Sequence, residues 1–204
     1  MNNLKLKTNA IAVCIITACI ALPSVTYAYD NDWQIHIAGI AAQKSVDNDG
    51  WLSNINNERS LQQESQLGVM FDIKQKSWPV AIAYDFFLSG DVMNSQGIKE
   101  KAYTTEQHLG IRKYWQSTNP SLQYYLGGGI AFSDSDFKTT SETDKTSYGD
   151  SDIGYWIGGG SNWTFAKNWY VGVDVRYSTG SLKLNNQERD VDGLMAGLTV
   201  GYNF

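Results

Sequence analysis

The chain has 204 residues, of which 42% are hydrophobic and 13% aromatic, and its 21 acidic residues outnumber 16 lysines and arginines. The net charge of −5 argues against a nucleic-acid partner, because binding to phosphates requires a surplus of positive charge. Both cysteines, Cys14 and Cys19, lie in an apolar N-terminal run. If that run is removed, the rest of the chain can form neither a disulfide framework nor a thiolate site.

The N-terminus has the order of segments that is typical of a secretory signal peptide. A basic first segment is followed by an apolar run over 10–22 and then by small residues, which include Thr26 and Ala28. This order predicts cleavage after Ala28. We therefore interpret 1–28 as a signal peptide and 29–204 as one exported domain.

A lipoprotein signal is the alternative interpretation of this segment. The sequence Ile-Thr-Ala-Cys at 16–19 resembles a lipobox, in which Cys19 would become the acylated N-terminus. A membrane-spanning helix is less favoured, because it needs about 20 apolar residues and this run is shorter.

Beyond the signal segment, the chain shows an alternation of apolar and polar residues with period two and no long stretch of helical period. The alternating segments have roughly the ten-residue length that a tilted strand needs to cross a bilayer. Eight segments can be distinguished. They are 32–43, 65–75, 78–89, 103–116, 121–132, 152–165, 169–179 and 191–204.

The two faces of these segments differ in a way that predicts the fold. One face is almost purely apolar, as in Leu67, Val69 and Phe71, whereas the other combines charged side chains with glycines. Small residues mixed with groups that can form ion pairs suit the narrow interior of an eight-stranded barrel, while an apolar outside suits lipid. We therefore predict an all-β fold, an eight-stranded antiparallel transmembrane up-and-down β-barrel.

Seven charged residues of the inner face are predicted to form a network in the lumen. Because unpaired charge is costly inside a protein, we expect ion pairs that hold the strands together and plug the barrel. An ion path or gate is the alternative. The predicted network consists of Asp72, Lys74, Asp85, Glu106, Arg112, Asp174 and Arg176.

Aromatic residues recur at strand ends that would all face the periplasm in an up-and-down barrel. Such rings favour the membrane interface, so we predict a periplasmic girdle. The connections on that side are short, and those on the other side, at 44–64, 90–102, 133–151 and 180–190, are long and polar. The girdle consists of Trp33, Trp78, Trp115, Trp163, Trp169 and Phe204.

Two stretches carry a resemblance to a known family, GGGSNWTFAKNWYVGVDVRYS and the C-terminal MAGLTVGYNF. The chain resembles the OmpA/OmpX-type small outer-membrane barrels. The resemblance implies location in the outer membrane, contact with its lipid and lipopolysaccharide, and recognition of the strand ending at Phe204 by the barrel-assembly machinery. Members of this family include structural proteins, adhesion or host-interaction proteins and a few lipid-modifying enzymes.

The sequence offers little that could carry covalent chemistry. The two histidines, His36 and His108, have no serine two residues away, and the acidic stretch from Asp47 to Glu58 has Leu52 where a calcium loop needs glycine. We therefore predict no catalytic residue, cofactor or metal, and a monomer with a structural or surface-interaction role. A narrow pore and a lipid-modifying enzyme are the alternatives, and the sequence names no partner for the loops.

Overall fold

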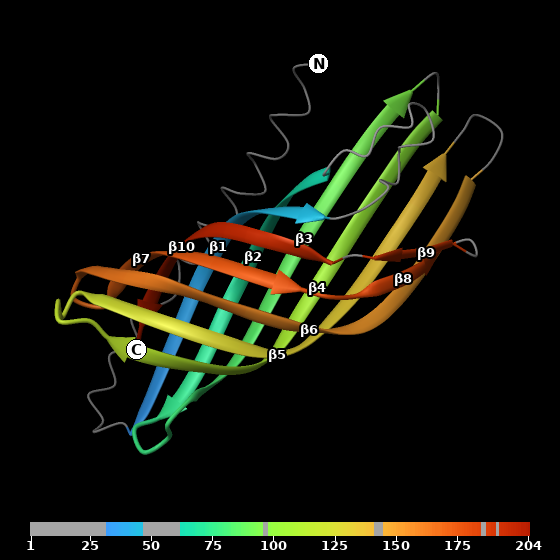
Figure 1. The fold of residues 1–204 in the computed structure, drawn as a ribbon. Coiled ribbons are helices and arrows are strands. Elements are labelled where there is room, and N and C mark those ends of the chain that lie inside the picture. The colour runs from blue at the N-terminus through green and yellow to red at the C-terminus, as the bar shows by residue number, and fades with distance from the viewer. Residues whose placement is uncertain (1–31, 47–61, 96–97, 141–144, 185–186, 191) are drawn as a thin grey trace.

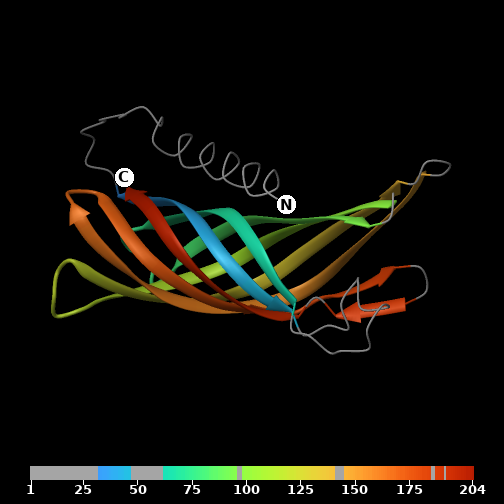
Figure 2. The ribbon, with the colours of Figure 1, turned by 90° about the horizontal axis from the view of Figure 1, so that it is seen from above.

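The structure is a closed antiparallel β-barrel (Figures 1 and 2). The computed structural model describes residues 32–46, 62–95, 98–140, 145–184, 187–190 and 192–204. The predicted signal peptide, 1–28, and the stretch from Asp47 to Glu58 lie outside these residues. The barrel strands are β1 (Trp33–Val46), β2 (Gln62–Gln75), β3 (Ala81–Ser95), β4 (Ile98–Gln116), β5 (Leu122–Thr140), β6 (Lys145–Ala166), β7 (Trp169–Ser178) and β10 (Gly193–Asn203).

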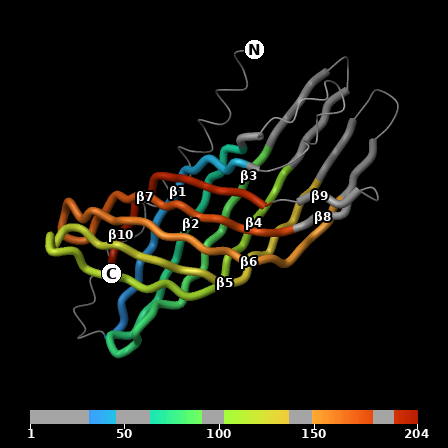
Figure 3. Tube along the Cα trace, viewed as in Figure 1, coloured from blue at the N-terminus to red at the C-terminus, as the bar shows by residue number. Residues whose placement is uncertain are grey.

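These eight strands confirm the predicted fold class. Each strand pairs with its neighbour in the chain, and β7 pairs with β10. The barrel closes because β10 also pairs with β1, from His36 opposite Asn203 to Val46 opposite Gly193. The strands wind around the barrel at a tilt (Figure 3). Among the described residues, no helix is long and apolar enough to span a bilayer.

Strands β3 to β6 are longer than predicted. The prediction of loops at 90–102 and 133–151 was wrong, because these stretches contain the ends of the strands, which pair as two hairpins, β3 with β4 and β5 with β6. β4 and β5 each contain 19 residues and β6 contains 22, whereas about 9–11 residues suffice to cross a bilayer. The two hairpins project beyond the barrel wall at one end (Figure 1). Their sequence is largely polar and its few apolar residues, such as Val92, Met93 and Phe137, do not alternate, so no apolar face marks them as strands. The predicted loop 180–190 likewise contains a small hairpin, β8 (Ser181–Leu184) with β9 (Gln187–Asp190).

Side-chain exposure alternates along the barrel strands, with apolar residues outside. On β4, Leu109 is 48% exposed while the neighbouring His108 is buried, and Ile111 is exposed while Arg112 is buried. The outer belt is apolar, as contact with lipid requires. Charged side chains and aromatic rings therefore lie together in the lumen of the barrel.

Short turns connect the strands at the end opposite the projecting hairpins. The Trp78 amide donates a hydrogen bond to the Gln75 carbonyl at 2.9 Å, and the Leu122 amide donates one to the Asn119 carbonyl at 3.0 Å. In the β6–β7 turn, Lys167 adopts a φ of 43°, in the left-handed region that favours glycine. The turn is tight enough to hold a lysine in a strained conformation.

Glycines allow β4 and β5 to approach closely near the middle of the barrel. Gly110 lies opposite Gly129, and a Cβ atom added to Gly129 would overlap the Leu109 carbonyl oxygen. A Cβ atom on the adjacent Gly128 would lie 3.1 Å from the Trp156 carbonyl oxygen, which requires only a small shift.

We therefore expect Gly129→Ala to destabilise the barrel by about 1–3 kcal/mol, the cost of an overpacked site. The matched variant Gly128→Ala should cost clearly less. Urea unfolding in lipid vesicles, followed by tryptophan fluorescence, measures both free energies. Equal stability of the two variants would contradict the close approach.

The C-terminus completes the seam of the barrel. The Phe204 amide donates a hydrogen bond to the Ile35 carbonyl at 2.8 Å, and the Phe204 ring packs on Tyr202 with a centroid distance of 4.7 Å. The backbone of Phe204 is therefore bound to β1, while its ring packs on Tyr202 of β10.

Removal of Phe204, or its replacement by aspartate, should lower the amount of folded protein in the outer membrane, because the closing strand loses the end of its apolar face. The fraction of heat-modifiable barrel on unboiled gels measures the effect. Tyr202→Phe, which keeps the ring, serves as the control. The same folded fraction in the wild type and the deletion variant would refute the expectation.

Candidate functional site

A layer of ion pairs crosses the lumen of the barrel. Arg112 on β4 forms the part of this layer that lies next to β2 and β3. Its Nη1 atom lies 2.7 Å from both carboxylate oxygens of Asp72 on β2, and its Nη2 atom lies 2.7 Å from Oδ2 of Asp85 on β3. The Tyr114 hydroxyl also donates a hydrogen bond to Asp72. One guanidinium therefore joins two carboxylates from different strands.

Arg176 on β7 continues the layer across the barrel. Its Nη1 atom lies 2.6 Å from the same Asp85 oxygen, and its Nη2 atom lies 3.2 Å from Oδ2 of Asp174. The guanidinium carbon lies 4.7 Å from the centroid of the Trp156 ring and 4.9 Å from that of Phe87. Ion pairs and aromatic faces thus enclose Arg176 together.

Glu106 on β4 forms a second group of contacts nearer the projecting hairpins. Its Oε1 atom accepts hydrogen bonds from Lys44 Nζ at 2.7 Å and from Gln66 Nε2 at 3.0 Å. Its Oε2 atom accepts one from the Ser178 hydroxyl at 3.3 Å and lies 3.3 Å from His108 Nε2. A single carboxylate therefore connects β1, β2, β4 and β7.

The energetics of this layer follow from its burial. Arg112 and Arg176 are each 1% exposed and Asp85 is 0% exposed, so water contributes little to their solvation. Each charge needs its partners, because the cost of desolvating an ion is offset inside a protein only by opposite charge and hydrogen bonds.

The structure brings together Asp72, Asp85, Glu106, Arg112, Asp174 and Arg176 of the predicted set. Lys74, the remaining member of that set, is half-buried and, within the described part of the chain, forms no ion pair. Lys44 replaces it. Sequence analysis missed Lys44 because it assigned the residue to a loop, although one more step of the β1 alternation places it inside.

The predicted girdle residues lie at the end of the barrel opposite the projecting hairpins. The indole of Trp33 packs edge-on against that of Trp78 at 5.4 Å, and Trp169 packs against Tyr202 at 5.2 Å. Trp163 is 57% exposed on the outside, and Trp115 and Phe204 are also exposed. Aromatic rings that are exposed at one end of an apolar belt suit a membrane interface.

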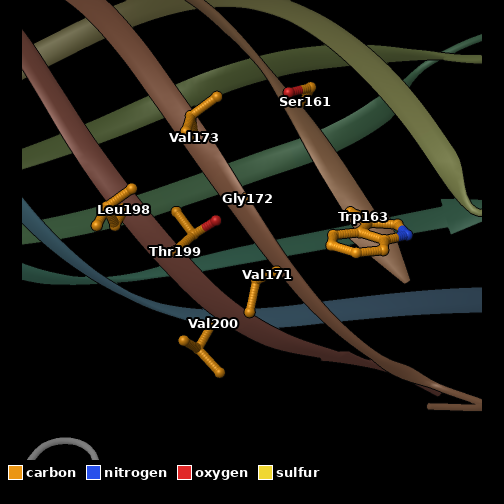
Figure 4. A pocket seen from close by; sticks show the side chains of 8 residues that line it. All are labelled: Ser161, Trp163, Val171, Gly172, Val173, Leu198, Thr199 and Val200. Carbon is orange, nitrogen blue, oxygen red and sulfur yellow. The ribbon is translucent and has the colours of Figure 1, made fainter. Parts of the chain in front are cut away.

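A hollow of about 380 Å³ lies on the outside of the barrel, near Trp163 (Figure 4). Its wall consists largely of exposed side chains from β6, β7 and β10, such as Val173 and Leu198. These residues belong to the apolar belt, so the hollow is a depression in the outer surface. Among the described residues, no group of three or more histidine, cysteine and acidic side chains could hold a metal ion.

Residues 12–204 match the family described as outer membrane protein beta-barrel domain. The chain belongs to this family. It is accordingly an outer-membrane protein, as predicted. Among curated protein sequences, none matches the chain significantly.

Solved structures of low sequence identity share the fold. A structure of Ail, the attachment invasion locus protein of Yersinia pestis, has a TM-score of 0.57 and 15% identity, over 85% of this chain and all of that one. The N-terminal barrel domain of Pseudomonas aeruginosa OprF has a TM-score of 0.52 and 15% identity, over 84% of this chain and 97% of that one. At these identities the likeness shows the barrel alone.

Replacement of Arg176 by alanine should lower the free energy of unfolding of this barrel by about 3–5 kcal/mol, because the carboxylate of Asp174 would remain buried without its cation. Urea titration in lipid vesicles measures the change. Lys113→Ala is the matched control: this lysine is exposed on the outer face over Trp115, so its loss should cost under about 1 kcal/mol. Equal effects of the two variants would argue against a stabilising layer.

Proposed function

We propose that this outer-membrane barrel is closed to ions and serves a structural or surface-interaction role, as a membrane anchor for its projecting hairpins. One observation carries the proposal: the ion pairs of Arg112 and Arg176 extend across the lumen from β2 to β7. An eight-stranded barrel is only wide enough for its side chains to fill it. A layer of paired charges in that space leaves little room for a column of water.

The hairpins support the surface-interaction part of the proposal. β5 and β6 pair along their full projecting length, from Ser133 opposite Asp152 to Thr140 opposite Lys145. A paired ribbon offers a defined surface above the membrane. We propose that the partner is not a polyanion of the kind bound in the Ail structure with a heparin analogue, because the paired stretches of β5 and β6 carry four aspartates, Asp134, Asp136, Asp150 and Asp152, against two lysines, Lys138 and Lys145.

We further propose that the chain performs no covalent chemistry. An acyl hydrolase or acyltransferase needs a histidine that can activate a nucleophile. Here the ring nitrogens of His108 face Arg176 and Glu106, and His36 packs against Tyr114 with a centroid distance of 5.0 Å. Among the described residues, neither histidine contacts a serine or threonine hydroxyl, and the hydroxyl of Tyr114 is bound to Asp72.

Planar-bilayer recordings at neutral pH test the closed lumen. The protein, purified from outer membranes and shown to be folded by its gel mobility, should give no stable conductance steps. A large porin recorded in the same bilayers provides the positive control. A reproducible wild-type conductance, with Arg176→Ala altering ion selectivity but not stability, would show a pore instead.

A further inference from the structure

We propose that His108 is an acid sensor of the lumen, which keeps the charged layer closed while its ring is neutral and opens a water path when the ring gains a second proton. This inference rests on the proposed closed lumen and adds an acid-activated permeability to it. It arises from the position of one imidazole between a cation and a carboxylate.

The contacts of His108 determine where its proton lies. Nδ1 lies 2.9 Å from Nη1 of Arg176, and Nε2 lies 3.3 Å from Oε2 of Glu106. A guanidinium can only donate hydrogen bonds, so Nδ1 must accept one. The neutral ring therefore carries its hydrogen on Nε2, directed toward the Glu106 carboxylate, although this second contact is too poorly aligned to count as a hydrogen bond.

The surroundings prevent the ring from turning away. His108 is buried and stacks on Trp156, with a centroid distance of 5.6 Å and an interplanar angle of 9°. Phe87 packs on it at 5.1 Å. A buried ring packed against two aromatic side chains cannot readily exchange its nitrogens, so Nδ1 stays opposite Arg176.

If Nδ1 took up a proton from water, its new N–H group would face the guanidinium of Arg176, which is also a donor. Two donors, both on cationic groups, would then face each other across the 2.9 Å contact with Arg176. The carboxylates that face the ring are already compensated: Glu106 on the same strand is paired with Lys44 from β1, and Asp85 from β3 is paired with two arginines. The layer as a whole has one carboxylate more than it has paired lysines and arginines, so the added charge is balanced overall and the repulsion is confined to the contact between Nδ1 and Arg176.

Arg176 is the group that is displaced when His108 is protonated. Its Nη1 atom holds both the His108 contact and the bond to Asp85 across the lumen, so a displacement of this guanidinium breaks the layer on the side of β7. Its bonds to Asp174, on its own strand, can be kept during such a movement. The released space would connect the polar region around Glu106 to the rest of the lumen.

The test compares planar-bilayer recordings of the full barrel in potassium chloride at about pH 7 and about pH 5. The lower value protonates most ordinary imidazoles and leaves ordinary carboxylates ionised. Because His108 is buried and faces Arg176, only a fraction of the molecules takes up the proton there, so the readout is the frequency of conducting events. The wild type should be silent at pH 7. At pH 5 the frequency of conducting events should rise reversibly by about tenfold or more, since one hydrogen bond to a charged group is lost.

Two variants give the result its specificity. His108→Gln keeps a neutral acceptor and donor but cannot take up a proton at pH 5, so it should remain silent. His36→Gln removes the other histidine, which packs on Tyr114 and not on Arg176, and should keep the acid response. Gel mobility at both pH values confirms that each variant is folded.

Nitrogen NMR of the wild type tests the same assignment without a mutation. At neutral pH, His108 should carry its hydrogen on Nε2, and its titration midpoint should coincide with that of the conductance. A hydrogen on Nδ1 at neutral pH, or an acid response retained in His108→Gln, overturns the proposal. Silence of the wild type at both pH values also overturns it but leaves the closed barrel intact, whereas equal conductance at both pH values refutes the closed barrel itself.

Discussion

The narrowness of an eight-stranded barrel is the constraint on which the rest of this structure depends. Lipid demands a largely apolar outside, so most charged and bulky polar residues of the spanning segments must share one small interior. There, a fully buried charge cannot rely on water and needs an opposite charge nearby, in most cases from another strand. The paired layer around Asp85, the aromatic faces of Trp156 and Phe87, and the glycines that make room for them are all responses to this single limit.

The barrel itself was predictable, because lipid on one side and a filled lumen on the other impose period-two alternation that can be read without any alignment. The predicted strands were too short at the end of the projecting hairpins, because the contrast between an apolar and a polar face ends there. The stretch Ser133–Thr140 is largely polar in sequence, so pairing with β6 holds it as a strand although it has no apolar signature. The hairpin of β8 and β9 was missed because each of its strands has only four residues, which is too short for a period-two pattern to stand out.

The site was predictable in its members but not in its contacts. Alternation placed Asp85, Arg112 and Arg176 inside, yet which carboxylate each arginine meets depends on stagger and tilt, which the sequence does not reveal. Lys44 and Lys74 illustrate the limit: both follow the inward parity, but the lysine near the short turns remains half-buried, whereas the one near the projecting hairpins reaches Glu106. Trp156 was missed because a tryptophan in a membrane strand is expected at an interface and not beside an arginine.

The bond between Arg176 and Asp85 has a mechanical consequence. In the ring of eight strands, β7 and β3 lie opposite each other, so this contact spans the full diameter of the tube. Backbone hydrogen bonds resist the separation of neighbouring strands, but they do little to stop a tube from flattening into an oval under lateral pressure. A diametric strut does resist flattening. The cross-section of this barrel should therefore remain round in bilayers of different thickness. A mismatch in thickness should instead tilt the whole barrel, and the projecting hairpins should tilt with it.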